Sequence, residues 1–241
     1  MQENRPIVLS IAGFDPCGGA GVLADVKTFE QLKTQGMAII TANTIQTEDR
    51  FIAIEWQDIQ KVQKGIETLM NRYAIQVIKI GIVKDFTFLK SIVDTIKANN
   101  SKAFIIWDPV IKSSSSFTFF KEDDIKELPV VLPDIDLLTP NYDEYELLGS
   151  VLTENNNVLI KGGHRKEQVG VDILRIGTHE IAILPDTTSA HPKHGSGCVL
   201  SSAIAAHFAL GHNLETACRL GKKYIENYLN SHSSLLGHHH D

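Results

Sequence analysis

Cysteine is scarce in this sequence. Only three cysteines occur among the 241 residues, at Cys17, Cys198 and Cys218. Their wide spacing indicates neither a disulfide framework nor a paired-cysteine metal site. The low cysteine content therefore favours a reduced, cytoplasmic protein.

Long apolar runs and an excess of positive charge are also missing. No stretch approaches the roughly 18 apolar residues that a membrane-spanning helix needs, and the opening MQENRPIVLSIAG lacks the apolar core of a signal peptide. The net charge is −6 and the isoelectric point about 5.9. An acidic chain does not favour nucleic acid or an anionic membrane surface. We therefore expect neither as a partner.

The sequence does contain short β-branched runs that alternate with longer stretches of helical periodicity. Strands are expected over residues 7–12, 38–43, 76–81, 103–108, 136–140 and 157–163, and helices over 24–33, 57–70, 86–99, 142–148, 197–210 and 214–229. Residues 171–176 and 179–185 flank a tight Gly-Thr and should form a hairpin. This order predicts one α/β domain over residues 1–241, with a mostly parallel sheet, helices on both faces and an antiparallel edge hairpin.

The chain ends in LLGHHHD, which looks partly like the remnant of an affinity tag. His238, His239 and His240 are therefore left out of the site hypotheses.

The segment HGSGC, residues 194–198, stands where the helix over 197–210 begins. The first N–H groups of a helix have no intrahelical partner and attract anions. A cysteine at that position should have a lowered pKa. One interpretation is a phosphate cradle with Cys198 as nucleophile or base, and the other is a helix start whose cysteine merely packs.

Polar segments follow the other expected strands, at the edge where parallel sheets bind ligands. The turn GFDPCGGAG, residues 13–21, matches neither the Rossmann nor the Walker A spacing. Asp25 in the following helix either points back at the strand ends or is a solvated carboxylate. Gln46, after the second expected strand, either reads a heterocycle edge or is an ordinary loop residue.

Several further candidates follow the later strands. Asp108 ends a continuously apolar strand, which favours a site role. Lys161, at the end of its expected strand, either points over a phosphate or is an ordinary surface lysine. Asn141 and Glu144 lie three apart at a helix start, which fits either a metal-bound water or a capping box. His164, His191 and His194 are candidates only through their positions near these segments.

Together these segments resemble the ribokinase-like superfamily, and most closely its hydroxymethylpyrimidine/phosphomethylpyrimidine kinases of thiamine synthesis. The matching segments, in the family's order, are IAGFDPCGGAGVLADVKTF, TIQTED, IKIGIV, WDPV, LLTPNYDEYELL, VLIKGGH and HGSGCVLSSAIAA. The first and last are specific to these kinases, whereas pyridoxal kinases and sugar kinases share the others. The resemblance implies a three-layer ribokinase-like fold, ATP with Mg²⁺, a small-molecule substrate and a homodimer.

The resemblance also implies a role for each matching residue. Cys198 would be the general base toward the substrate's primary hydroxyl, at a position where sugar kinases carry aspartate. Gly195, Ser196 and Gly197 would complete the anion hole with Cys198. The remaining roles would be pyrimidine contacts for Gly13, Asp25, Gln46, Ile82 and Val110, nucleotide contacts for Lys161 and Asn141, and the metal position for Asp108 and Glu144.

Two segments depart from the family pattern. The family usually carries KSG shortly after DPV, whereas residues 112–117 here contain no glycine, which bears on how the loop closes over substrate. The family also carries an additional helix before VLIKGG, where this chain has only GSVLTENNN. The sheet should therefore lose one covering helix.

Four functions fit these observations. The first is phosphorylation of hydroxymethylpyrimidine and then of its monophosphate, and pyridoxal kinase is its nearest alternative. A cysteine hydrolase or acyltransferase that uses Cys198 would need a histidine–carboxylate pair. A degenerate member would bind pyrimidine or nucleotide without turnover.

Overall fold

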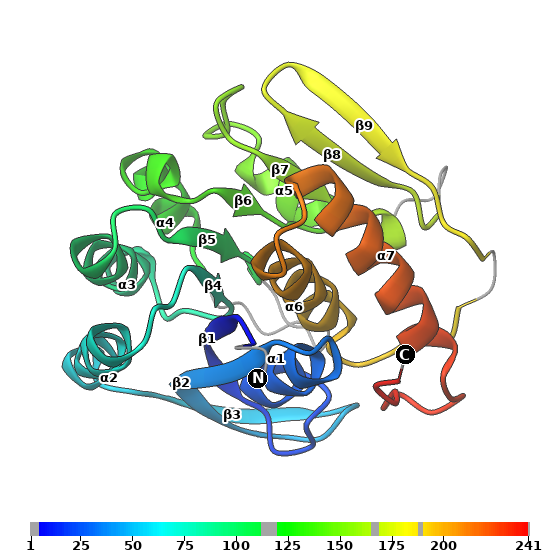
Figure 1. The fold of residues 1–241 in the computed structure, drawn as a ribbon, viewed down its shortest axis with the longest axis horizontal. Coiled ribbons are helices and arrows are strands. Elements are labelled where there is room, and N and C mark those ends of the chain that lie inside the picture. The colour runs from blue at the N-terminus through cyan, green and yellow to red at the C-terminus, as the bar shows by residue number, and fades with distance from the viewer. Residues whose placement is uncertain (1–4, 112–119, 165–168, 188–189, 241) are drawn as a thin grey trace.

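The computed structural model describes residues 5–111, 120–164, 169–187 and 190–240. The altered segment 112–117 lies outside the described residues. Within the described ranges the strands form one sheet, in the order β3-β2-β1-β4-β5-β6-β7-β8-β9 (Figure 1). Their bounds are β1 (Ile7–Phe14), β2 (Gln35–Gln46), β3 (Phe51–Trp56), β4 (Val77–Ile80), β5 (Phe104–Trp107), β6 (Leu137–Leu138), β7 (Val158–Ile160), β8 (Asp172–Ile176) and β9 (His179–Ile183).

The helices cover the sheet on both faces. Their bounds are α1 (Gly21–Gln31), α2 (Ile59–Arg72), α3 (Phe86–Asn99), α4 (Glu122–Glu127), α5 (Tyr142–Leu148), α6 (Ser196–Ala209) and α7 (Leu214–Asn230). Side chains of Asp58, Asp85 and Asn213 accept hydrogen bonds from the first turns of α2, α3 and α7. These caps satisfy N–H groups that the helices leave unpaired, and so fix where each helix begins.

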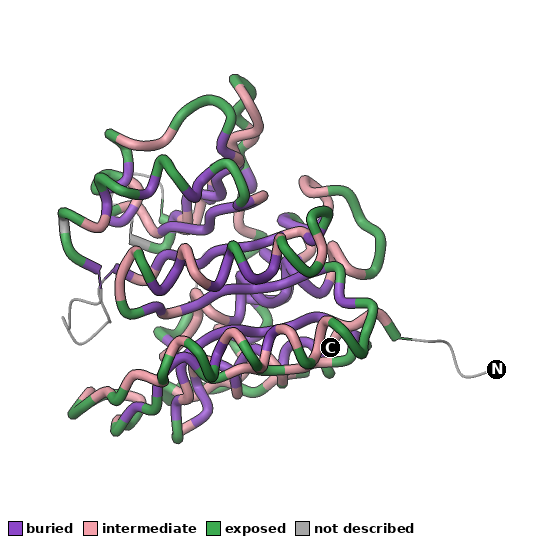
Figure 2. The backbone as a smooth tube through the Cα atoms, turned by 90° about the vertical axis from the view of Figure 1, so that its left-hand side faces the viewer, coloured by how far each residue is buried: buried purple, intermediate pink, exposed green. Residues whose placement is uncertain are grey.

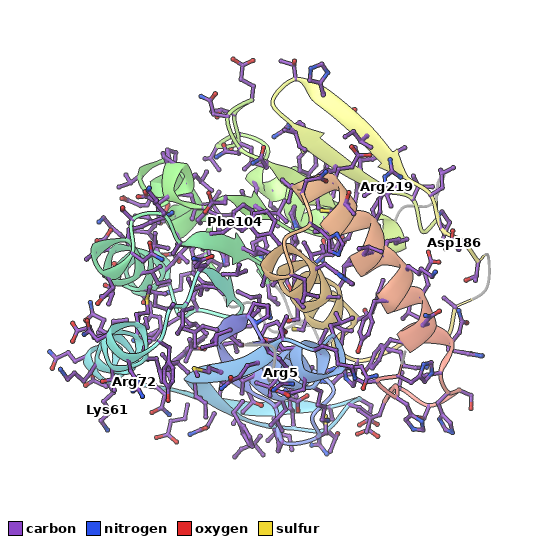
Figure 3. All side chains as sticks on the ribbon, in the orientation of Figure 1. Arg5, Lys61, Arg72, Phe104, Asp186 and Arg219 are labelled. Atoms are coloured by element: carbon purple, nitrogen blue, oxygen red, sulfur yellow. The ribbon has the colours of Figure 1, made fainter. Side chains whose placement is uncertain are left out.

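Two apolar cores separate the three layers. One core packs α2, α3, α4 and α5 against the sheet, and the other packs α1, α6 and α7 against the opposite face. In Figure 1, α2, α3 and α4 lie on one side of the strands and α1, α6 and α7 on the other, and in Figure 2 the buried backbone runs between exposed outer turns. Phe104, which begins β5, stacks on Phe208 of α6 at 3.8 Å, whereas Lys61 and Arg72 of α2 lie at the outer surface (Figure 3). The predicted three-layer α/β arrangement is confirmed.

The sheet is parallel in its centre and antiparallel at both edges. Strands β2, β1, β4, β5, β6 and β7 pair in parallel. The predicted hairpin is β8–β9, which adds to β7 in antiparallel fashion. At the other edge β3 pairs antiparallel with β2. The sequence prediction missed β3 and α4, and it made β2 too short. The segment FIAIEW, which forms β3, was given no element in that prediction.

The sequence predicted that no additional helix precedes the strand of VLIKGG, and the structure confirms this. Residues 149–157 connect α5 to β7 through turns, with no helix between them. The side chain of Asn156 caps this connection by accepting from the Thr153 N–H at 2.9 Å. No helix among the described residues is both long and apolar enough to cross a membrane.

Candidate active site

A cleft of about 890 Å³ lies at the carboxyl ends of the parallel strands. This is the edge where ligands bind to open α/β sheets, since strand ends and helix starts converge there. Twelve of the thirteen predicted site residues line it: Gly13, Gln46, Ile82, Asp108, Val110, Asn141, Glu144, Lys161, Gly195, Ser196, Gly197 and Cys198. The thirteenth, Asp25, does not.

The start of α6 forms one wall of the cleft. Gly195 precedes the helix in the left-handed region, with φ of 72°. A Cβ at Gly195 would stand 2.0 Å from the carbonyl oxygen of Gly19, so only glycine allows this close approach of two loops. Ser196, Gly197 and Cys198 form the first turn, and all three line the cleft. Their N–H groups have no partner within the helix, which makes this wall suited to an anion.

The thiol of Cys198 lies beside this turn and is partly buried. Burial raises its pKa to about 11, and the carboxylates of Asp25 and Asp108 add to the rise, whereas Lys79 opposes it. The prediction of a lowered pKa at the helix start is therefore wrong. Desolvation outweighs the helix end and the nearby lysine, and the thiol is neutral at neutral pH.

Lys161 and Asp108 form an ion pair inside the cleft. Lys161 Nζ lies 2.7 Å from Asp108 Oδ1, and the Asp108 side chain is 1% exposed. Thr139 and Ser201 also donate hydrogen bonds to this carboxylate. The Lys161 ammonium lies close to the first turn of α6. A Cβ built on Gly197 would stand only 3.1 Å from Lys161 Nζ. The positive charge of Lys161 therefore lies next to the free N–H groups at the start of α6, and both can attract an anion.

Burial opposes the charge on both partners of this pair. For Lys161, the Asp108 and Glu144 carboxylates outweigh burial and raise the pKa above its usual range. For Asp108, Lys161 and Lys79 outweigh burial and hold the pKa below its usual range. Both groups are therefore charged at neutral pH, and the cleft keeps a fixed cation next to the anion wall.

Asn141 and Glu144 form the capping box of α5. Asn141 Oδ1 accepts from the Glu144 N–H at 2.8 Å, and Glu144 Oε2 accepts from the Asn141 N–H at 2.8 Å. Glu144 also accepts from the N–H of Ile111. Burial raises the pKa of Glu144 to about 7. The local capping interpretation is confirmed, and the cap also lines the cleft.

Asp25 lies beneath the cleft. Its side chain is fully buried, and Lys79 Nζ reaches its Oδ2 at 2.9 Å. The hydroxyls of Ser10 and Ser202 donate to the same carboxylate. The predicted contact between Asp25 and a substrate is therefore replaced by a supporting role, because the side chain is fully buried and does not line the cleft. Lys79 was missed, since a lysine inside the apolar strand VIKI looks like a surface residue of an alternating pattern.

Comparison with known proteins places this arrangement in a family. The model of the phosphomethylpyrimidine kinase family matches residues 15–241. The chain belongs to this family. It is 30% identical to the hydroxymethylpyrimidine/phosphomethylpyrimidine kinase of Aquifex aeolicus over 95% of this chain and 96% of that one. It is 31% identical to the Rhizobium meliloti protein of the same name, covering 91% of this chain and 88% of that one.

Solved structures agree with the family membership. The phosphomethylpyrimidine kinase from Clostridium difficile 630 superposes with a TM-score of 0.76 at 31% identity, covering 92% of this chain and 98% of that one. The pyridoxal kinase from Staphylococcus aureus in complex with ADP has a TM-score of 0.83 at 23% identity, covering 94% and 89%. The second likeness shows the fold alone. The predicted ribokinase-like kinase fold is confirmed.

Nothing in the sequence indicated that two residues of the cleft, Asp15 and His194, form a pair. Asp15 and His194 both line the cleft, and His194 Nε2 lies 3.0 Å from Asp15 Oδ2. Burial acts to raise the pKa of Asp15, but hydrogen bonds from His194, Cys17 and the Ala20 N–H outweigh it and hold the pKa at about 2. The pair joins the glycine-rich turn after β1 to the segment before α6. Sequence alone placed both residues in polar loops but gave no signal that the loops meet.

The C-terminal segment packs against the same region. The carbonyl of Leu235 accepts from the His194 N–H at 2.9 Å. His239 packs on the ring of Tyr228 with centroids 4.8 Å apart, and its Nδ1 lies 3.0 Å from the hydroxyl of Tyr224. His239, which was left out of the site hypotheses as a possible tag residue, thus contacts α7. The ring is part of the fold, and the segment supports the loop that leads into α6.

Proposed function

We propose that this chain is an ATP-dependent kinase that phosphorylates the hydroxymethyl group of hydroxymethylpyrimidine, and then the resulting monophosphate, in thiamine biosynthesis. Residues 1–241 act as a single kinase domain in this proposal. The observation that carries it is the meeting of the α6 N-terminus, the Lys161 ammonium and the Cys198 thiol in one cleft of a phosphomethylpyrimidine kinase family member.

Phosphoryl transfer depends on alignment and on positive charge around the moving group, with little covalent help from the protein. The free N–H groups of Ser196, Gly197 and Cys198 supply donors for the oxygens of that group. Lys161 supplies a fixed cation beside them and, with Asn141, contacts the nucleotide. Preorganised donors of this kind stabilise the charge where it develops in the transition state.

The substrate hydroxyl loses its proton during transfer, and Cys198 Sγ is the acceptor in this proposal. Because the resting thiol is neutral, it must first release its own proton to solvent in the cleft, and the thiolate then takes the proton from the hydroxyl. Lys79, fully buried beneath the thiol, favours the thiolate by its charge. Cys198 forms no covalent intermediate in this scheme.

A competing use of Cys198, in acyl transfer, would need a histidine beside the thiol. His194 lies four residues away but directs Nε2 at Asp15. This contact gives the acyl-transfer hypothesis no support from His194. The kinase proposal needs no such histidine.

Asp108 and Glu144 fit the metal role. Magnesium keeps several of its waters and takes one or two carboxylates together with phosphate oxygens. The cleft offers two carboxylates at neighbouring strand and helix ends. Bound Mg²⁺ would neutralise phosphate charge there, and Asn141 and Glu144 would orient its waters. Glu144 is the residue whose protonation would weaken this site, since its pKa is about 7.

The other end of the cleft accepts the pyrimidine. Gly13 lies near the end of β1, Ile82 follows β4, and Gln46 ends β2. The side-chain amide of Gln46 offers one acceptor and two donors, which suit the ring nitrogen and amino group of an aminopyrimidine. Ile82 and Val110 provide apolar contact with the ring faces.

We also propose that the chain forms a homodimer. In the β2–β3 hairpin, Ile45 is 61% exposed and Ile52 is 57% exposed. Ala53, also exposed, lies opposite Ile45 across the strand pair. Such an apolar patch suits a protein interface. Sedimentation velocity tests it: an Ile45→Lys variant should sediment as a monomer, and an unchanged dimer would place the interface elsewhere.

Product analysis tests the activity. The protein is incubated with ATP, Mg²⁺ and hydroxymethylpyrimidine, and phosphorus NMR then identifies the phosphorylated products. The monophosphate should appear first and the diphosphate second. Tight pyrimidine binding without either product would instead establish a non-catalytic binding protein. Phosphorylation of pyridoxal alone would establish a pyridoxal kinase.

A further inference from the structure

We propose that Asp15, Cys17 and His194 form a binding site for one thiophilic divalent cation of the Zn²⁺ class. The three side chains each offer one ligand atom, and these atoms all lie within 4.8 Å of one another. The site is separate from the Asp108 and Glu144 carboxylates. It lies where the turn after β1 meets the segment before α6.

The ligand atoms are already gathered around the carboxylate. His194 Nε2 lies 3.0 Å from Asp15 Oδ2, and Cys17 Sγ lies 3.0 and 3.2 Å from the two carboxylate oxygens. In a tetrahedral zinc site the metal stands about 2.0–2.3 Å from oxygen, nitrogen and sulfur ligands, which places those atoms roughly 3 to 4 Å apart. Small side-chain rotations therefore suffice to admit the ion.

Backbone groups hold Asp15 and His194 in place. The N–H of Ala20 donates to Asp15 Oδ2 at 2.8 Å, and the N–H of Cys17 donates to Asp15 Oδ1 at 3.1 Å. The His194 N–H is tied to the carbonyl of Leu235. Supporting hydrogen bonds of this kind orient metal ligands and raise affinity. The Asp15 side chain is only 2% exposed and that of His194 10%, so two of the three ligands are already shielded from water.

The donor types select the cation. A thiolate and an imidazole prefer zinc and related transition metals, whereas magnesium prefers oxygen ligands. On binding, Cys17 Sγ–H loses its proton to the solvent as the sulfur–metal bond forms, and no electron is transferred. Asp15 and His194 line the cleft, so a fourth position is open to water or to a ligand oxygen. A bound ion would lock the two loops together at the point where Gly19 meets Gly195.

A Co²⁺ titration of the full-length protein tests the site, because cobalt bound to a thiolate gives a charge-transfer band in the near ultraviolet. We expect the band to saturate at one Co²⁺ per chain, to disappear on addition of Zn²⁺ and to persist in a large excess of Mg²⁺. Cys17→Ser should abolish the band. Asp15→Asn should weaken Co²⁺ binding at least tenfold.

Two control variants separate this site from other ligands. Cys198→Ser removes the thiol that lines the cleft, and His238→Ala with His240→Ala removes two exposed histidines near the C-terminus. The band should survive in both. The proposal is overturned if the parent gives no band, if Cys17→Ser retains it, or if either control loses it. Because Cys17 is partly exposed, its serine variant should fold even where Asp15→Asn does not.

Discussion

Lys79 and Asp25 form an ion pair at 2.9 Å, and both side chains are fully buried. The pair lies beneath the start of α6, where Ser202 of that helix also donates to Asp25. It therefore links β4, α1 and α6 under the cleft. Burial opposes the charge of Lys79, but Asp25 and the other nearby acidic groups outweigh burial and raise its pKa.

Removing one partner of this pair should be costly. Lys79→Met leaves the Asp25 carboxylate buried without its cation, and we expect the free energy of unfolding to fall by about 3–5 kcal/mol. Urea denaturation measures the change. The double variant Lys79→Met/Asp25→Leu should recover part of the loss, because it removes both charges. A single variant within about 1 kcal/mol of the parent would show that the pair is unimportant for stability.

Substitutions at Cys198 test its proposed role as base. Cys198→Ala should lower kcat by about 10²–10⁴-fold, the range of general acid–base catalysis. Its pyrimidine affinity should stay within about tenfold, or about 1.4 kcal/mol. Cys198→Asp restores a proton acceptor and should be faster than Cys198→Ala. An unchanged kcat in the alanine variant would remove the base role.

The pH dependence of kcat/KM follows from the raised pKa of Cys198. With a pKa of about 11, the thiolate fraction grows about tenfold per pH unit in the range below it. Between roughly pH 8 and pH 10, log kcat/KM should therefore rise with a slope near one, because it reports ionisations of the free enzyme. Glu144, with a pKa of about 7, is ionised throughout this range. A flat profile in the parent, or an equal slope in Cys198→Asp, would contradict thiolate catalysis.

The C-terminal segment should detach in mild acid. Burial lowers the pKa of His239 from 6.5 to about 4, so the unfolded chain binds its proton more readily than the folded chain. This contribution is fully present above about pH 6.5 and is lost as the pH falls toward 4. Burial also lowers the pKa of His207 to about 4, so the comparison must be made against a variant. His239→Phe keeps a ring against Tyr228 without titrating.

The measurement for this prediction is the thermal midpoint of both proteins across the window from about pH 7 to pH 4. The midpoint of His239→Phe should fall less than that of the parent. Parallel curves would show that His239 does not contribute to the acid sensitivity.

Most of the fold was predictable from sequence, because strand ends and helix starts carry local signals, and twelve residues that the family resemblance singled out line one cleft. The turn HGSGC and the capping pattern of Asn141 and Glu144 each specify local geometry, and parallel strands bring such segments to one edge. The strand β3 was not predictable in this way. FIAIEW lies at an edge, where its side chains are exposed or half-buried and its pairing depends on β2.

The errors concern burial rather than position. Cys198 was correctly placed at the start of α6, but its pKa depends on desolvation and on Asp25 and Asp108, which lie far away in sequence. For Asp25 the sequence left open an inward-pointing and a solvated carboxylate; the side chain is buried, and Lys79 takes up its carboxylate. His239 looked like a tag residue until its contacts with Tyr224 and Tyr228 were known. Such long-range contacts leave no local pattern.

The most direct test of the account is a comparison of kcat/KM for hydroxymethylpyrimidine and for pyridoxal, measured by ADP release with saturating ATP and Mg²⁺. The account predicts ADP formation with hydroxymethylpyrimidine and a kcat/KM at least tenfold higher than with pyridoxal. Equal or greater kcat/KM for pyridoxal, or no ADP above the substrate-free control with hydroxymethylpyrimidine, would contradict it.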